Sequence, residues 1–66
     1  MRKLSRLDQR IYDTLRILNR MPAKGRTTKQ IAHLHRLPLG RVRYLMNEAV
    51  RCQNVRKSDG SRWVLL

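Results

Sequence analysis

Two short apolar patterns lie close together in the segment TTKQIAHLHRLPLGRVRYLM, residues 27–46. Each pattern has the three- and four-residue spacing of a helix with one buried face. Leu37-Pro38 separates them, because proline cannot continue a helix and restricts the residue before it. The segment therefore predicts two short helices joined by a tight turn. Their inner faces are expected to pack together through Ile31, Ala32, Leu37, Val42, Leu45 and Met46.

The chain carries a large excess of positive charge. Its 66 residues include 16 Lys and Arg but only 4 Asp and Glu, which gives a formal net charge of +12. Like charges repel one another when such a chain folds, and a polyanion relieves the repulsion. Most of the cations are Arg, whose planar guanidinium binds phosphates and guanine edges through paired hydrogen bonds. The charge balance therefore favours a nucleic acid as the partner.

The length predicts one domain over residues 1–66, with a small core. No apolar run approaches the roughly 18 residues of a membrane span, and no charged stretch followed by an apolar region opens the chain. We therefore expect a soluble protein of the cytoplasm or nucleoplasm, without a membrane partner. The single cysteine, Cys52, cannot form an internal disulfide.

A third helix is predicted ahead of the opening segment. Ser5 and Asp8 fit a capping box, and large aliphatic residues then recur at helical spacing to about Arg20. Met21-Pro22 ends this helix, and residues 23–26 leave room for one short strand. The stripe that we expect to be buried consists of Leu4, Leu7, Ile11, Leu15 and Leu18.

The starts and ends of the other two helices have their own signals. Thr27 and Gln30 form a second predicted capping box, so a helix begins at Thr27 and runs to the break at Leu37-Pro38. The next helix spans residues 39–51. Its buried face is predicted to consist of Val42, Leu45, Met46 and Ala49.

From about Gln53 the sequence predicts a β-hairpin, because strand-forming residues flank the turn signal Asp59-Gly60. A two-residue turn would pair Val55 with Val64, whereas a three-residue loop with Gly60 left-handed would pair Val55 with Trp63. We favour the second pairing, because it buries the larger side chains. The inward face would then consist of Val55, Trp63 and Leu65, and the outward face of Arg56, Arg62 and Val64.

Four apolar residues of the two central helices, Ala32, Leu37, Val42 and Met46, match the characteristic spacing of winged helix-turn-helix domains. The predicted order of three helices and a hairpin also resembles that family over the whole chain. The resemblance implies an α+β fold, a three-helix bundle with a C-terminal hairpin called the wing. Two positions differ. His35 stands where the family usually has Leu, so that either Leu34 or His35 fills this place, and Arg36 stands where it often has Gly.

The short length and a tryptophan near the end, Trp63, are similar to the small phage, plasmid and pilus-operon transcription regulators of bacteria. This resemblance implies a cytoplasmic, bacterial or phage-encoded regulator of transcription. Z-DNA-binding domains also carry a Trp in the wing. However, Arg43 and Asn47 stand where those domains have Asn and Tyr, and no Pro pair precedes Trp63.

If the third helix docks as in other helix-turn-helix proteins, its outward face enters the major groove of double-stranded DNA. Arg41 or Arg43 would bind guanine, and Asn47 would bind adenine. Tyr44 either contacts DNA or is a half-buried ring that covers the edge of the second helix. The outward residues of this helix are predicted to be Gly40, Tyr44, Asn47 and Arg51, flanked by Arg41 and Arg43.

Further cations are predicted to contact the DNA backbone or the minor groove. They are Lys29 at the start of the second helix and Arg56, Lys57 and Arg62 in the wing. A domain this small makes few base contacts, so we expect an operator to bind two copies, either as a protein dimer or at repeated sites.

An enzyme is not expected, because the four acids are dispersed and no pair of them suits acid–base chemistry. His33 and His35 point in different directions on a helix, so no metal site is predicted, and no cofactor or small-molecule ligand is indicated. Two alternatives remain. The chain could bind structured RNA, or it could be a protein-interaction domain that modulates a host enzyme.

Overall fold

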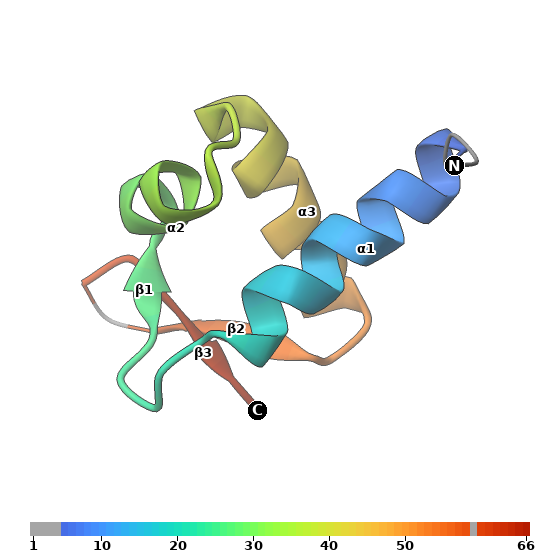
Figure 1. Ribbon diagram of the computed structural model, residues 1–66. Coiled ribbons are helices and arrows are strands. Elements are labelled where there is room, and N and C mark those ends of the chain that lie inside the picture. Colours follow the sequence, from blue (N-terminus) through green and yellow to red (C-terminus); the bar gives the residue numbers. More distant parts are fainter. Residues whose placement is uncertain (1–4, 59) are drawn as a thin grey trace.

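A computed structural model describes residues 5–58 and 60–66. Over these residues it is a small α+β domain, as predicted, with three helices and a three-stranded antiparallel sheet. α2 and α3 lie beside each other, α1 crosses α3, and the sheet lies at one end of the helices (Figure 1). In chain order the elements are α1 (Arg6–Asn19), β1 (Arg26–Thr27), α2 (Thr28–His35), α3 (Leu39–Arg51), β2 (Val55–Ser58) and β3 (Arg62–Leu65).

Local capping fixes the starts of α1 and α2. The Ser5 hydroxyl accepts a hydrogen bond from the backbone N–H of Asp8 at 3.1 Å. At α2 both bonds of the predicted capping box are present: Thr27 Oγ1 accepts from the Gln30 N–H at 3.2 Å, and the Gln30 side chain accepts from the Thr27 N–H at 2.9 Å. These bonds satisfy backbone donors that the first turn of a helix leaves free. The predicted starts of both helices are confirmed.

α1 has the predicted extent but not the predicted buried face. Leu7, Ile11 and Leu15 are 57%, 50% and 53% exposed, whereas Asp13 and Ile17 are buried. Leu18 packs partly against the core, and Leu4 lies outside the described residues. Asp13 and Ile17 each follow a residue of the leucine stripe by two positions, and two residues are about 200° of helix rotation. The expectation that this stripe forms core was therefore wrong for its three described central members.

The physical reason is the carboxylate of Asp13, which is only 6% exposed. Its Oδ2 pairs with Nη2 of Arg41 on α3 at 3.1 Å, and its Oδ1 accepts from the Gln9 amide at 3.0 Å. A carboxylate can be buried at low cost only when such partners surround it. Turning the leucine stripe inward would move Asp13 away from Arg41, so the ion pair and the exposed leucines are two aspects of one arrangement.

The core lies between α2, α3 and the sheet, and α1 contributes to it mainly through Ile17. The predicted buried stripe of α3 is confirmed, and Leu37 at the turn is partly buried against the core. Among the described residues, the buried hydrophobic core consists of Ile17, Met21, Ile31, Ala32, Val42, Leu45, Met46, Ala49, Val55 and Trp63.

The strands are arranged in the order β1-β3-β2, so β3 is central. The short strand for which residues 23–26 left room is present at Arg26–Thr27, and Arg26 pairs with Trp63. The residue just before this strand must be glycine, because the backbone of β3 approaches it closely. A Cβ at Gly25, whose φ is +79°, would lie 2.4 Å from the carbonyl oxygen of Trp63.

Both predicted hairpin pairings were wrong, because Val55 pairs with Leu65. Ser58 pairs with Arg62 across the base of the loop, so the loop begins one residue later than the favoured pairing requires. Gly60 has the expected left-handed conformation, with φ of 80°, and Asp59 lies outside the described residues. The observed register differs from the favoured one by two residues, so every side chain keeps its predicted face. Val55 and Trp63 are buried, whereas Leu65 is 39% exposed.

At the position where winged helix-turn-helix domains usually have a buried Leu, the buried side chain here is His35 and not Leu34. His35 is 9% exposed and Leu34 is 46% exposed. Among the described residues, nothing hydrogen-bonds to Nε2 of His35. Burial lowers the pKa of His35 below its usual 6.5, the nearby Arg16, Arg20 and Arg26 lower it further, and Asp13 opposes them. His35 is therefore a neutral core side chain.

This lowered pKa predicts a pH-dependent stability. Because the unfolded chain takes up the proton more readily than the folded one, the contribution of neutral His35 is complete above pH 6.5. It falls as the pH drops below that value and is lost once the pH passes the folded-state pKa. Urea unfolding between pH 8 and pH 5 should show this loss in the parent protein and in His33→Gln, but not in His35→Leu. An equal pH dependence in all three proteins would contradict the assignment.

Candidate nucleic-acid interface

The outer face of α3 carries the residues that the sequence predicts there. Val42, Leu45, Met46 and Ala49 point inward, and the side chains on the opposite face are open to solvent. The exposed residues of α3 are the predicted Gly40, Arg43, Tyr44, Asn47 and Arg51, together with Leu39 and Val50. The helix thus has one buried apolar face and one exposed, mostly polar face, which includes two arginines and an amide.

Arg43 and Asn47 are the two polar side chains of this face that have no polar partner among the described residues. Both are exposed, and they are four residues apart, which is about one helical turn. Within residues 5–58 and 60–66, neither side chain makes a hydrogen bond or an ion pair with another group. Their guanidinium and amide groups are therefore available to a ligand.

Arg41 is placed differently from Arg43, although the sequence treats the two as equivalent. Its Nε and Nη2 both donate to Oδ2 of Asp13, at 3.3 and 3.1 Å, and its side chain is 36% exposed. Two donors on one carboxylate oxygen hold the guanidinium against α1. The main role of Arg41 is consequently to join α3 to α1.

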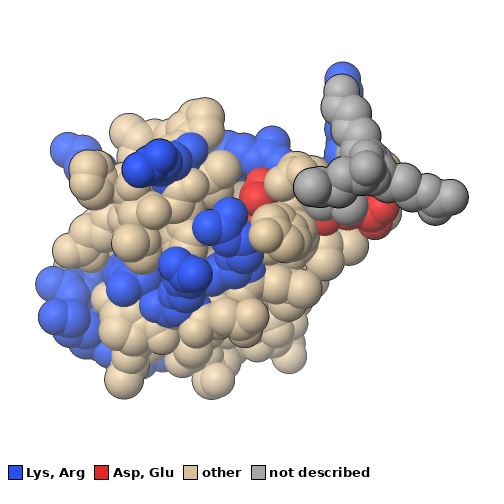
Figure 2. All heavy atoms as spheres, viewed as in Figure 1, with Lys and Arg blue, Asp and Glu red and all other residues tan. Residues whose placement is uncertain are grey.

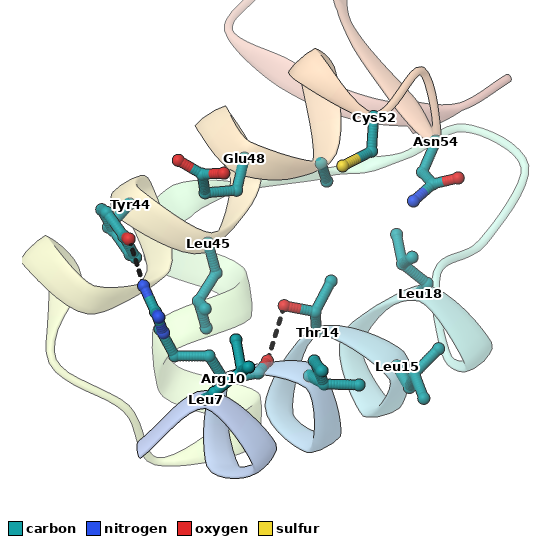
Figure 3. Close-up of a pocket in the computed structure, with 12 residues that line it drawn as sticks. Leu7, Arg10, Thr14, Leu15, Leu18, Tyr44, Leu45, Glu48, Cys52 and Asn54 are labelled. Atoms are coloured by element: carbon teal, nitrogen blue, oxygen red, sulfur yellow. Dashed lines mark hydrogen bonds between the residues drawn. The ribbon is translucent and has the colours of Figure 1, made fainter.

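Tyr44 also contacts α1, which neither alternative for this residue anticipated. The Arg10 guanidinium donates to the Tyr44 hydroxyl, and its Cζ lies 5.6 Å from the centre of the ring. Figure 3 shows Arg10 reaching from α1 to Tyr44 across the gap between the two helices. Tyr44 remains 44% exposed, so one side of the ring is covered and the other is open.

The first and last turns of α3 differ in how their polar groups are satisfied. Pro38 is the N-cap residue and supplies no side-chain hydrogen bond. A Cβ at Gly40 would meet no atom within 4 Å, so the backbone there is open. At the other end, Arg51 pairs with Glu48 at 2.8 Å, and 75% of its side chain is exposed. Pairing at such exposure is weak and easily exchanged.

The hairpin is connected to the start of α2 through Trp63. Its indole Nε1 donates to Oγ1 of Thr28 at 2.9 Å, and the ammonium of Lys57 lies 5.1 Å from the ring centre. Lys29, Arg56 and Lys57 are exposed, and Arg62 is partly buried. Trp63 therefore lies between Lys57 of the hairpin and Thr28 at the start of α2.

Other arginines that the sequence reasoning did not select add to the basic surface. Arg16, Arg20 and Arg26 lie close enough to His35 to lower its pKa, and Arg36 at the turn after α2 is exposed with φ of 55°. In the view of Figure 2, Lys and Arg are spread over much of the described surface. The visible acidic atoms gather near the N-terminal half of α1. The sequence carried a signal for Arg36, because it stands at the turn after the second helix, where the family that the chain resembles often has Gly.

The described residues contain no group of three or more His, Cys, Asp or Glu that could hold a metal ion. None of the helices over residues 5–58 is long and apolar enough to cross a membrane. No protein-family model, curated protein or solved structure matches this chain.

The contact between Asp13 and Arg41 predicts a measurable loss of stability. Asp13→Asn removes the charge that holds a half-buried guanidinium, so we expect the free energy of unfolding to fall by about 1–3 kcal/mol. Glu48→Gln, which breaks the exposed pair with Arg51, is the matched control and should change it by less than about 0.5 kcal/mol. Urea denaturation followed by circular dichroism measures both. Equal, small effects would show that Asp13 does not set the position of α1.

Proposed function

We propose that this protein is a winged helix-turn-helix domain that binds double-stranded DNA and acts as a small transcription regulator. In this proposal α3 enters the major groove, and the β2–β3 hairpin is the wing that contacts the backbone or the minor groove. The order of helices and strands is compatible with this fold. The net charge of +12 supplies the sequence-independent attraction to phosphate.

One observation carries the proposal: Arg43 and Asn47 are exposed one turn apart on a helix whose opposite face is core. An α-helix fits the major groove, where arginine binds guanine O6 and N7 and asparagine binds adenine N6 and N7. Side chains without an intramolecular partner lose little when they bind a base. We therefore assign base reading to Arg43 and Asn47.

The neighbouring residues support this docking without reading bases. Arg41 orients α3 through Asp13, and Tyr44 is held by Arg10. The open backbone at Gly40 and the uncapped first turn of α3 suit a phosphate. Arg51, paired only with Glu48, can exchange that partner for a phosphate oxygen.

The wing and the start of α2 would bind the flanking phosphates together. The bond from Trp63 to Thr28 fixes the hairpin relative to α2, so Lys29, Arg56 and Lys57 keep a constant spacing. Such contacts set the position of a protein on DNA without reading its sequence. Arg62, which is partly buried, has a smaller part in this surface.

The division between reading and positioning predicts two kinds of variant. For an operator selected from random duplexes, Arg43→Ala and Asn47→Ala should each reduce the preference for one base pair, by about 1–3 kcal/mol. Lys57→Ala should weaken binding to every duplex alike and reduce the slope of log K against log salt by about one. Fluorescence anisotropy over a range of salt concentrations measures both effects.

Lys24→Ala is the matched control, because Lys24 is exposed in the connection before β1, outside the proposed surface. It should change affinity less than Lys57→Ala does. Equal losses on selected and random duplexes for Arg43→Ala would contradict base reading. Tighter binding to an RNA hairpin than to any DNA duplex at the same salt would replace DNA by structured RNA as the target.

A further inference from the structure

The outward-turned leucine stripe of α1 forms one wall of an apolar groove of about 360 Å³ between α1 and the C-terminal half of α3. Leu7, Ile11 and Leu15, each about half exposed, lie on the α1 side, and Leu45 and Cys52 are on the other wall. Figure 3 shows Leu45 and Cys52 reaching toward α1. A chain with so small a core gains stability by burying large aliphatic side chains. The exposure of these three therefore indicates that another molecule covers them.

The stripe has a symmetry that points to its occupant. Leu7 lies four residues before Ile11, and Leu15 lies four residues after it. If two copies of α1 pack antiparallel about a two-fold axis at Ile11, each Ile11 meets its own copy and each Leu7 meets Leu15 of the other chain. A two-fold interface requires this kind of self-complementary pattern. An unrelated partner helix would not require it.

The charges beside the stripe fit the same arrangement. The first turn of α1 carries the exposed Asp8, and Arg16 lies over the ring of Tyr12, with its Cζ 5.6 Å from the ring centre. In the antiparallel pair, Asp8 of one copy lies level with a point midway between Tyr12 and Arg16 of the other. It is about 3 Å from each of them, measured along the helix axis. Two pairs of opposite charges, related by the two-fold axis, therefore lie at similar heights along the helices.

The distribution of acids also makes this the least repulsive side of a basic molecule. Of the three acids among the described residues, Asp8 is exposed on α1 and Glu48 lines the groove, whereas Asp13 is buried and paired with Arg41. Two copies that approach through this side bring their acidic residues together with arginines, whereas approach through the hairpin or α2 would bring cations against cations.

We propose that two copies of this chain associate through the leucine stripe of α1, antiparallel about a two-fold axis at Ile11. A stable interface buries about 800 Å² per partner, more than three half-exposed aliphatic side chains provide. The dimer is consequently weak, and screening of the repulsion between the chains strengthens it.

This dimer leaves the proposed base-reading residues free. Glu48 lines the groove, and Asn47, the preceding residue, points about 100° away from it around α3. Arg43 lies one turn before Asn47 on the same side. The association is a property of the free protein and does not depend on DNA binding, so either proposal can fail without the other.

Sedimentation equilibrium of the full chain tests the dimer. At about 1 M NaCl, where the Debye length is about 3 Å, we expect a reversible monomer–dimer equilibrium that is tighter than at about 0.15 M. Ile11→Glu and Leu15→Glu should each raise the dissociation constant by more than about tenfold, because each change replaces one buried aliphatic side chain in both copies by a charged one. Leu34→Glu, at similar exposure on α2, is the matched control with the same charge and should leave it unchanged.

A cysteine placed at the axis gives an independent readout. In a Cys52→Ser background, Ile11→Cys should form a covalent dimer on mild oxidation faster than Leu34→Cys does, because only position 11 meets itself. Circular dichroism confirms that each variant is folded. The proposal is overturned if the parent chain stays monomeric at both salt concentrations, if Ile11→Glu associates as the parent does, or if the two cysteine variants cross-link equally. A monomer would mean that the groove serves a different protein.

Discussion

The buried carboxylate of Asp13 is the constraint on which the arrangement of this small domain depends. It must lie beside Arg41, because few other groups in the interior could compensate its charge. That requirement fixes the rotation of α1 on α3. It places Ile17 in the core and turns Leu7, Ile11 and Leu15 to the edge of a groove. The orientation of one helix is thus determined by an ion pair against the preference of its largest apolar stripe.

The same ion pair separates the roles of two arginines on α3. Arg41 is used inside the molecule, whereas Arg43, two residues later, is exposed and uncommitted. α3 consequently has three sides: one in the core, one against α1 and the groove, and one that offers Arg43 and Asn47. Under the two proposals, another copy of the chain packs on α1 beside the second side, and the third side reads DNA.

The sequence predicts the features that depend on local interactions. Capping at Ser5 and Thr27, the turn at Leu37-Pro38 and the buried face of α3 follow from neighbours a few residues apart, and the structure has all of them. The rotation of α1 depends on a contact between residues 28 positions apart. Helical periodicity carries no information about such a pair, so the stronger apolar stripe was misleading.

The hairpin and the candidate site show the same limit. Alternation identified the inward faces of Val55 and Trp63, but the register depends on where the loop begins. For the site, helix geometry placed Arg43 and Asn47 on the open face. It could not reveal that Arg41 is held by Asp13 or that Tyr44 is held by Arg10, because both partners come from α1.

Chemical-shift mapping during titration with a DNA duplex tests the central claim, that the face of α3 opposite the core binds DNA. The account predicts the largest shifts at the side chains of Arg43 and Asn47 and at the backbone of Gly40, with smaller ones in the hairpin. The side chains of Leu7 and Leu15 should be unaffected at a concentration where the protein is monomeric. Shifts confined to α1, with Arg43 and Asn47 undisturbed, would contradict the account.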